Sequence, residues 1–345
     1  MSMRVQSSGC PPWGFFILSR FLASRWHTTV SAVLVSLWIG GIASAAISGG
    51  LSDMKRRQQG ILTGMPFMAH VSQRSFIDDL GRRIFLAKPP VRIVSLAPSV
   101  TETLFALGAG DQIVGVTQFC DYPVEAQTKP KVGYPRPNLE SLVALQPDLI
   151  LAPREFLQPD VLAKLEQLKI AVFVIDAKTV EDIVTHMTTV GRMLERTGSA
   201  NDLAARIRHR IADIKSRTSA FPKRRVLYVL NSEPLMTVGQ GSFIHQMIEV
   251  AGGVNIAGRS GVPYPRLSME EVLKQDPEVI LFPVGKAETV SDEEQRVWRR
   301  WTSVSAVKQG RFAGIPSDLV NRPGPRIGEG LEALARAIHP EALTP

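Results

Sequence analysis

Cysteine is scarce in this 345-residue chain, which contains only Cys10 and Cys120. Cys10 precedes an apolar run, Val30 to Ile42, that ends in Ala43-Ser44-Ala45, the small-residue pattern of a signal-peptide cleavage site. Cleavage there would leave Cys120 alone. A disulfide within the mature chain is then excluded, so its stability must come from a hydrophobic core.

Acidic residues are missing from the first 45 positions, which carry Arg4, Arg20 and Arg25. Basic residues followed by an apolar run predict a secretory signal peptide over residues 1–45. A retained membrane anchor is the alternative, because the run approaches the ~17 residues needed to span a bilayer. Either interpretation predicts export of the remaining chain to the periplasm. Residues 46–74 have no hydrophobic pattern and are predicted to be a flexible spacer.

Concentrated basic patches and catalytic motifs are also missing. The formal net charge is +8, but three of these charges belong to the leader and no aromatic residues alternate with the others, so no nucleic-acid partner is expected. Neither a His-Glu-x-x-His, a Gly-x-Ser-x-Gly nor a P-loop motif occurs. We therefore do not expect this protein to be an enzyme. An exported enzyme with Asp121 and Asp318 as a carboxylate pair is the alternative from another functional class.

What the chain does have is an alternation of short apolar runs with helical patterns, which predicts parallel α/β structure. Asp79 to Arg82 predicts a hairpin turn, and Arg92 to Leu96 predicts a buried strand. Ser99 is the predicted N-cap of the next helix, with Glu102 as its capping-box partner. Further strands are expected at 113–116, 149–151, 171–175 and 225–230, and further helices at 139–145, 162–168, 199–219 and 243–250.

One segment occurs twice. Residues 139–153 and 269–283 align without a gap at a spacing of 130, and each predicts a helix, a proline-acid turn and a buried strand. Glu140 and Glu270 are among the identical pairs. The repeat predicts two similar α/β lobes, the N-lobe over 75–198 and the C-lobe over 222–345, joined by a linking helix over 199–221. Small molecules commonly bind in clefts between such units, at the loops that follow strands.

Several segments resemble the helical-backbone solute-binding proteins of ABC importers, which carry vitamin B12, ferric siderophores or haem. The segments that carry the resemblance are Arg92-Ile-Val-Ser-Leu-Ala-Pro-Ser-Val-Thr-Glu102, Cys120-Asp-Tyr-Pro123, Asn138-Leu-Glu140, Gln146-Pro-Asp148, Ala251-Gly-Gly-Val-Asn-Ile256 and Gly324-Pro-Arg326. The resemblance implies two Rossmann-like lobes joined by one long rigid helix, the class III periplasmic binding protein fold. It also implies a monomer that has no cofactor or metal of its own and delivers a metal complex to a permease.

Within this family the chain is most similar to cobalamin-binding members, through its Asp-Tyr-Pro turn and the spacing of Asp318 and Arg322. The resemblance implies that Tyr122 and Tyr134 place aromatic rings on the ligand, while Asp318 and Arg322 bind polar groups on its rim. The competing interpretation of Asp318 and Arg322 is a surface ion pair. Arg154 is a further candidate contact.

Two alternatives concern what individual residues do. Cys120 could bind a metal, although burial as a small apolar side chain is favoured. Glu140 and Glu270 are implied to dock on arginines of a dimeric permease, because two equivalent carboxylates suit a two-fold partner. The competing interpretation is that each acid only stabilises a helix N-terminus.

Departures from the cobalamin-binding pattern keep other ligands open. Tyr134 stands where such proteins can have tryptophan, and Pro153-Arg154 stands where another aromatic residue can occur. A ferric siderophore would use cations such as Arg136 and Arg154. Haem would use Tyr122, Tyr134 or a histidine on its iron.

Overall fold

The protein was analysed as a computed structural model, which describes residues 74–134, 136–285 and 292–343. The predicted leader, with Cys10, and all of the predicted spacer but its last residue lie outside the described residues. Among those residues, no helix combines the length and the apolar composition needed to cross a bilayer.

The N-lobe contains a parallel sheet of four strands in the order β4-β3-β5-β6. Its strands are β3 (Ile93–Ser95), β4 (Ile113–Val116), β5 (Leu149–Pro153) and β6 (Val172–Ile175). A hairpin of β1 (Arg74–Ile77) and β2 (Arg83–Leu86) precedes this sheet, which confirms the turn predicted at Asp79 to Arg82.

The C-lobe has a second parallel sheet, in the order β10-β7-β11-β12. Its strands are β7 (Arg224–Tyr228), β10 (Gly253–Asn255), β11 (Val279–Val284) and β12 (Phe312–Pro316). A short antiparallel pair, β8 (Asn231–Ser232) and β9 (Leu235–Met236), follows β7. In each lobe the first strand of the sheet lies between the second and the third, so the two sheets have one topology.

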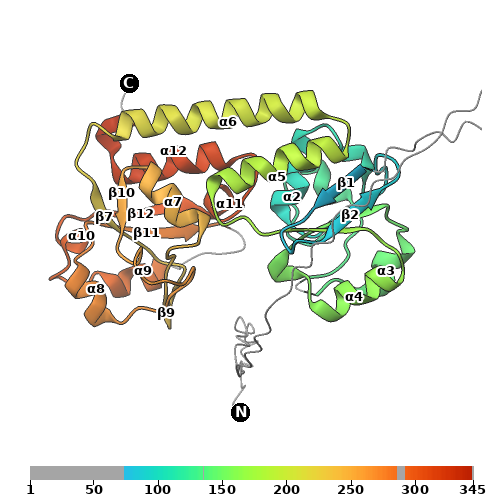
Figure 1. The fold of residues 1–345 in the computed structure, drawn as a ribbon. Helices are drawn as coiled ribbons and strands as arrows, with labels where there is room; N and C mark the ends of the chain where they lie inside the picture. Colours follow the sequence, from blue (N-terminus) through green and yellow to red (C-terminus); the bar gives the residue numbers. More distant parts are fainter. Residues whose placement is uncertain (1–73, 135, 286–291, 344–345) are drawn as a thin grey trace, which may run out of the picture. The chain divides into compact units, whose positions relative to one another are not determined.

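Helices cover both sides of the sheets (Figure 1). The N-lobe helices are α2 (Pro98–Ala106), α3 (Leu139–Ala144), α4 (Pro159–Gln167) and α5 (Val180–Met193). The C-lobe helices are α7 (Phe243–Val250), α8 (Met269–Gln275), α9 (Asp292–Trp298), α10 (Ser305–Lys308), α11 (Ser317–Val320) and α12 (Ile327–Ile338). In Figure 1, α3, α4 and α8 lie on the side of the sheets opposite to α6, α12 and α5.

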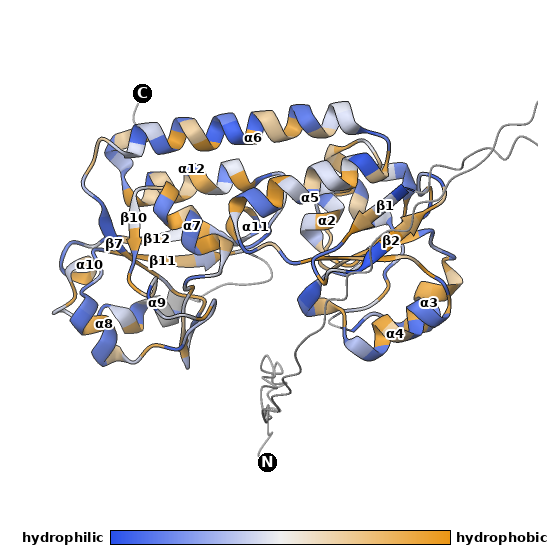
Figure 2. Cartoon of the chain, in the orientation of Figure 1, coloured by the Kyte–Doolittle hydropathy of each residue, from blue (hydrophilic) through white to orange (hydrophobic). Residues whose placement is uncertain are grey.

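The linking helix is α6 (Thr197–Thr218), which confirms the helix predicted over 199–219. Its apolar residues, among them Leu203, Ile207 and Ile214, are buried, and the helix packs on α5 and α12. Figure 2 shows hydrophilic and hydrophobic residues along its whole length, and the buried positions recur at the spacing of one helix face, as in an amphipathic helix. Its basic residues bind acids on its neighbours, as in the ion pairs of Arg208 with Glu181 and of Arg210 with Glu332.

One hydrophobic cluster joins the two lobes beneath α6. It contains residues of both sheets, such as Leu149 and Leu281, together with buried residues of α5, α6 and α12. Helix α5, which the sequence analysis missed, also bonds to the C-lobe, because the amide of Val180 donates to Gln246 Oε1 over 3.0 Å. The two lobes are therefore joined by a shared hydrophobic core as well as by α6.

The sequence repeat is also a repeat of structure. Asn138 and Ser268, which are 130 residues apart, are the N-caps of α3 and α8, and each accepts a bond from the amide three residues on. Gln146 and Asp276, at the same spacing, both take the left-handed conformation after these helices, with φ of 45° and 43°. When residues 139–153 are compared with residues 269–283, equivalent positions are buried or exposed to the same degree, except for the pair 146 and 276.

An arginine fixes each of these helix-strand units to its sheet. Arg92 donates from Nε to the carbonyl of Gln146, and Arg225 donates from Nε to the carbonyl of Asp276. The backbone amides of the same arginines donate to the carboxylates of Asp148 and Glu278. The two units are therefore held by the same bonds as well as the same cap.

The predicted capping box of the first sheet helix is wrong. Helix α2 begins at Pro98 after Ala97, and no side chain caps it. Proline suits the first helical position because the amide it lacks would have had no partner inside the helix. The carboxylate of Glu102 is instead used at the junction of the lobes.

Candidate ligand-binding site

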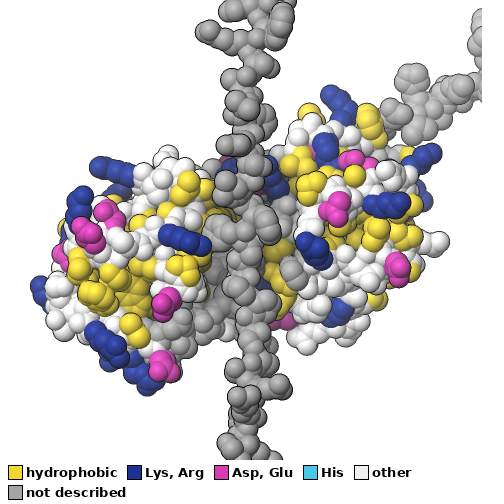
Figure 3. All heavy atoms as spheres, turned by 90° about the horizontal axis from the view of Figure 1, so that it is seen from below, with side chains coloured by type: hydrophobic (Ala, Val, Ile, Leu, Met, Phe, Trp, Pro, Cys, Tyr) yellow, Lys and Arg dark blue, Asp and Glu magenta, His cyan; other side chains and the backbone are white. Residues whose placement is uncertain are grey.

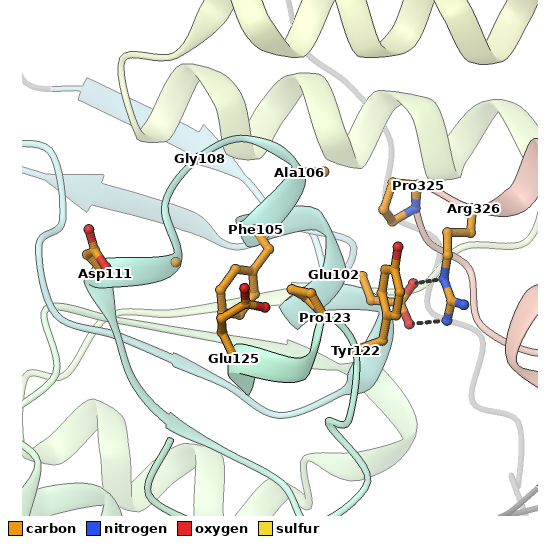
Figure 4. Close-up of a pocket in the computed structure, with 11 residues that line it drawn as sticks. Glu102, Phe105, Ala106, Gly108, Asp111, Tyr122, Pro123, Glu125, Pro325 and Arg326 are labelled. Carbon is orange, nitrogen blue, oxygen red and sulfur yellow. Dashed lines mark hydrogen bonds and ion pairs between the residues drawn. The ribbon is translucent and has the colours of Figure 1, made fainter. Parts of the chain in front are cut away.

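Glu102 of α2 lies at the centre of the lobe junction, and its side chain is only 1% exposed. Arg326 donates to it from Nε and Nη2 over 2.8 and 2.7 Å, and Arg322 donates from Nη1 over 3.0 Å. Both arginines belong to the C-lobe segment between α11 and α12. One N-lobe carboxylate therefore holds two C-lobe guanidinium groups (Figure 4 shows its bonds to Arg326).

Arg322 also binds one acid from each lobe. Its Nη1 lies 2.9 Å from Asp121 Oδ1 of the N-lobe, and its Nη2 lies 2.7 Å from Asp318 Oδ1 of the C-lobe. Burial alone would lower the pKa of Arg322, but its bonds to Asp121 and Glu102 outweigh burial and raise the pKa above its ordinary value. Arg322 therefore stays charged, and it orients both aspartates, which are partly exposed.

The pKa of Arg326 shifts in the same direction. Burial opposes the charged form, whereas the hydrogen bond and charge of Glu102 raise the pKa above its ordinary value. The guanidinium carbon of Arg326 lies 4.1 Å from the centre of the Tyr122 ring, a cation–π distance. Tyr122 is half exposed, so one face of its ring contacts the arginine while other parts of the side chain reach solvent.

Two hollows border this cluster. The larger, about 490 Å³, is lined by Phe105, Tyr122, Pro123, Arg326 and neighbouring residues, several of which Figure 4 shows around the Phe105 ring. The smaller, about 390 Å³, is lined by Phe119, Cys120, Asp121, Lys131, Arg322 and two glutamines. Asp121 and Tyr122 are adjacent in the chain but border different hollows.

Aromatic side chains of the N-lobe gather after its strands. The Tyr134 ring lies 4.5 Å from Phe119 in an edge arrangement and 5.2 Å from Phe156. Phe119 follows β4 and Phe156 follows β5, at the strand ends where open parallel sheets bind ligands. Phe119 is 39% exposed and lines the smaller hollow, so this cluster offers apolar area beside Arg322.

The structure brings together three of the predicted ligand contacts, Tyr122, Asp318 and Arg322. Tyr134 belongs to the neighbouring aromatic cluster. Asp318 and Arg322 do form the i, i+4 ion pair, but Arg322 is 11% exposed and bonded across the junction, so this is no simple surface pair.

Arg154 and Cys120 make no bond to the cluster, although Cys120 lines the smaller hollow beside it. The Arg154 side chain is 56% exposed and pairs with Asp176 over 3.1 Å. Cys120 is 1% exposed and its sulfur lies 3.2 Å from the Thr117 hydroxyl, which agrees with the interpretation of a buried apolar side chain. In the part of the chain that is described, no group of three or more acidic, histidine or cysteine side chains is placed to hold a metal.

Sequence reasoning missed Glu102 and Arg326 as site residues and considered Asp121 only as a catalytic acid. Glu102 and Arg326 both stand in segments that carried the family resemblance. Their partnership spans 224 residues, and no local pattern predicts it.

The predicted docking acids lie on the two repeated helices. Glu140 is in the first turn of α3 and Glu270 is in the first turn of α8, and both are exposed. Within the described residues, neither carboxylate has an ion-pair or hydrogen-bond partner. They are free to meet another molecule on the side of the sheets opposite to α6 (Figure 1).

Comparison with known proteins identifies the family. The family model described as periplasmic binding protein matches residues 93–319, which include both four-stranded sheets and, of the junction residues, Glu102, Asp121 and Asp318. The chain belongs to the periplasmic binding protein family.

Relatives with known structure or function share most of this chain. The vitamin B12-binding protein of Vibrio cholerae serotype O1 is 33% identical over 251 residues, which cover 72% of this chain and 89% of that protein. The solved structure of periplasmic vitamin B12-binding protein BtuF of Vibrio cholerae aligns with a TM-score of 0.65 at 31% identity, covering 74% of this chain and 99% of that one. These likenesses confirm the predicted two-lobed, class III fold.

Other similar proteins have different roles. An ABC transporter substrate-binding lipoprotein of Bacillus subtilis, itself uncharacterised, is 31% identical over 276 residues, covering 77% of this chain and 86% of that protein. The structure of the periplasmic haem-binding protein RhuT from Roseiflexus sp. RS-1 aligns with a TM-score of 0.63 at 25% identity, covering 73% of this chain and 98% of that one. Proteins with this fold thus bind more than one kind of ligand, so the ligand has to be inferred from the residues of the site.

Proposed function

We propose that this protein is the substrate-binding component of an ABC importer, exported from the cytoplasm, that captures cobalamin or a related corrinoid between its lobes. The observation that carries the proposal is the cluster of Arg322, Asp121 and Asp318 beside the exposed rings of Tyr122 and Phe119. Family membership and the vitamin B12-binding relatives support it.

The chemistry of the cluster suits the rim of a corrinoid. Corrinoid side chains end in neutral amides, which both donate and accept hydrogen bonds. Asp121 and Asp318 offer partly exposed carboxylate acceptors, and Arg322 holds them in place as well as offering donor N–H groups. The rings of Tyr122 and Phe119 add flat apolar area for the macrocycle.

The charge balance of the cluster favours a neutral ligand over a ferric siderophore. Three carboxylates, Glu102, Asp121 and Asp318, surround two guanidinium groups, so the cluster carries no excess positive charge.

Of Arg136 and Arg154, the cations expected for a siderophore binder, Arg154 is paired with Asp176, whereas Arg136 is exposed and has no ion-pair partner among the described residues. Lys131 also lines the smaller hollow and, within the described part of the chain, bonds only to the Ala126 carbonyl, so an anionic complex would meet one cation there beside three carboxylates, whereas a neutral amide rim needs no cation.

A haem-binding protein of the same family is the second candidate, which the RhuT likeness favours. Haem would need a side chain that binds its iron. Tyr122 and Tyr134 are the tyrosines near the junction, and the Tyr122 ring is covered on one side by Arg326. An exported enzyme has little support, because Asp121 and Asp318 are both bonded to Arg322 rather than poised to transfer a proton.

The importer role further implies a permease partner in the inner membrane. Glu140 and Glu270, exposed and equivalent, are the proposed contacts of a monomeric binding protein with two permease subunits. They suit a two-fold partner because each lobe presents the same charge on the same structural unit.

Ligand titration tests the proposal. Residues 74–345 would be purified and titrated by calorimetry and absorbance with cyanocobalamin, cobinamide, haem and a panel of ferric siderophores. We expect the corrinoids to bind, and Arg322→Gln to weaken that binding by about 100-fold, as for a hydrogen-bonded charge at an interface. Arg210→Gln is the matched control, because Arg210 pairs with Glu332 on the outer surface.

The same titration can overturn the assignment. Binding of haem or a siderophore without binding of either corrinoid would replace the proposed ligand class. An unchanged corrinoid affinity in Arg322→Gln would show that the ligand lies elsewhere.

A further inference from the structure

The repeat places a second matched pair beside the two glutamates. Val143 in α3 and Leu273 in α8 are 130 residues apart, like Glu140 and Glu270, and both are exposed apolar side chains. Their exposed fractions, 37% and 38%, are nearly identical. Single exposed apolar residues need no explanation, but two at equivalent positions of a duplicated unit do.

Helical geometry brings each apolar residue next to its acid. Glu140 and Val143, like Glu270 and Leu273, are three residues apart, so their side chains lie on one face of their helix. The neighbouring exposed position is not kept, since Ala144 in α3 corresponds to Lys274 in α8. An acid followed by an apolar residue is thus what the two exposed helix faces share.

Both helices hold these side chains on a fixed backbone. Each has a side-chain N-cap, and each is followed by a left-handed residue whose carbonyl accepts from Arg92 or Arg225. These supports repeat in the same order in the two lobes. Two faces presented by the same unit are equivalent targets for two equivalent partners.

We propose that Glu140 with Val143, and Glu270 with Leu273, form a duplicated docking epitope for the two subunits of the permease. Each subunit presents a basic side chain for the glutamate and, beside it, an apolar contact for the valine or leucine. This inference rests on the proposed importer function and adds the apolar half of the interface. Protein interfaces commonly combine an apolar centre with charged groups at its rim.

Figure 3 shows the side of the molecule that carries α3 and α8. Hydrophobic side chains gather on both lobes there, with separate acidic and basic side chains among them. An acid alone would bind any cation, whereas an apolar neighbour requires a partner surface that excludes water. The epitope therefore distinguishes a fitted protein partner from a merely basic one.

The experiment measures binding of the full-length, ligand-loaded protein to proteoliposomes that contain its cognate ABC permease dimer. The variants are Val143→Ser, Leu273→Ser, their combination, and the exchange Val143→Leu with Leu273→Val. Val254→Ser is the matched control, because Val254 on β10 is 42% exposed and lies outside the repeated unit. Urea unfolding and cyanocobalamin titration check that each variant remains folded and binds ligand.

We expect each serine variant to weaken permease binding about fivefold and the combination about 25-fold, as for independent contacts at an interface. The exchange variant and Val254→Ser should bind like the unaltered protein, and ligand affinity should not change in any variant.

Unchanged permease binding in the combined variant, together with loss of binding in Glu140→Lys/Glu270→Lys, would overturn the epitope and leave the docking acids in place. Unchanged binding in both double variants would overturn the importer docking itself. Weakened permease binding in only one of the two single serine variants would also refute a duplicated epitope. The same holds if the serine variants lose binding to a second copy of this protein and keep binding to the permease.

Discussion

The N-lobe and the C-lobe are alike in one place and different in another. They share the strand order of their sheets, the caps of α3 and α8, and the arginine bonds that fix these helices. At the junction they differ, since the N-lobe supplies Glu102 and aromatic rings whereas the C-lobe supplies Arg322 and Arg326.

This difference corresponds to the two kinds of partner that we propose. A permease with two equal subunits requires the same contacts twice, so the duplicated helices keep the exposed acid and the apolar residue three positions after it. A ligand between the lobes has no such symmetry, and the residues around it are free to diverge. The importer role thus accounts for likeness at α3 and α8 and for difference at the cleft.

The largest effect should come from reversing the charge on the shared surface. Glu140→Lys/Glu270→Lys is expected to reduce uptake by about 100-fold or more, because like charges facing each other across an interface cost several kcal/mol. Uptake of labelled cyanocobalamin into permease proteoliposomes measures it.

The control for this variant is Glu329→Lys, which also removes an exposed acid from the first turn of a helix, α12. It should leave uptake unchanged, whereas a purely helix-stabilising role for the two glutamates would make all three positions alike. Weakened cyanocobalamin binding in the double variant would count against a docking role.

A smaller effect, on stability, is expected where the lobes differ. Glu102→Gln leaves Arg322 and Arg326 without their buried counter-charge, so the free energy of unfolding should fall by about 3 kcal/mol. Glu332→Gln removes an acid that pairs with Arg210 and Arg336 at the surface, and should cost less than about 1 kcal/mol. Urea denaturation of both variants compares them; equal losses would show that the junction bonds contribute no more than a surface pair.

The smallest effect concerns the one position where burial in the repeat differs. Hydrogen bonds from the Ser305 hydroxyl and amide hold the pKa of Asp276 below its ordinary value of 3.8, with a further contribution from Arg225. A carboxyl whose pKa is lower in the folded state stabilises the fold above its unfolded pKa and loses this contribution as the pH falls through the folded pKa. Asp276→Asn should therefore cost less than about 1 kcal/mol at pH 7, because the group is partly exposed.

That cost should shrink as the pH falls below 3.8 and should disappear once the pH passes the lowered pKa of the folded state, where the natural side chain is also neutral. Gln146 is the uncharged counterpart in the N-lobe, and Gln146→Asn should show no such change over the same range. Urea denaturation at pH 7 and pH 3 measures both; a cost for Asp276→Asn that is independent of pH would exclude an ionic contribution.

Much of the fold could be predicted because its signals are local. The strands at 113–116 and 149–151 and the helix at 243–250 follow from runs of apolar residues between turn residues, and the structure confirms them. The start of α2 was mistaken for a capping box because Ser99 and Glu102 have the spacing of one. Proline at the first helical position and the burial of Glu102 against two arginines decided otherwise.

The sequence by itself determined the two lobes, the linking helix and the paired glutamates, since a repeat of residue types at a constant spacing survives without any knowledge of packing. Only the tertiary structure decided that Glu102 meets Arg322 and Arg326, that Asp121 and Asp318 share Arg322, and that Val143 and Leu273 are equally exposed. The physical reason is that charge pairing and burial depend on which surfaces the folded chain brings together. For residues hundreds of positions apart, no local sequence pattern shows which of them will pair in the folded protein.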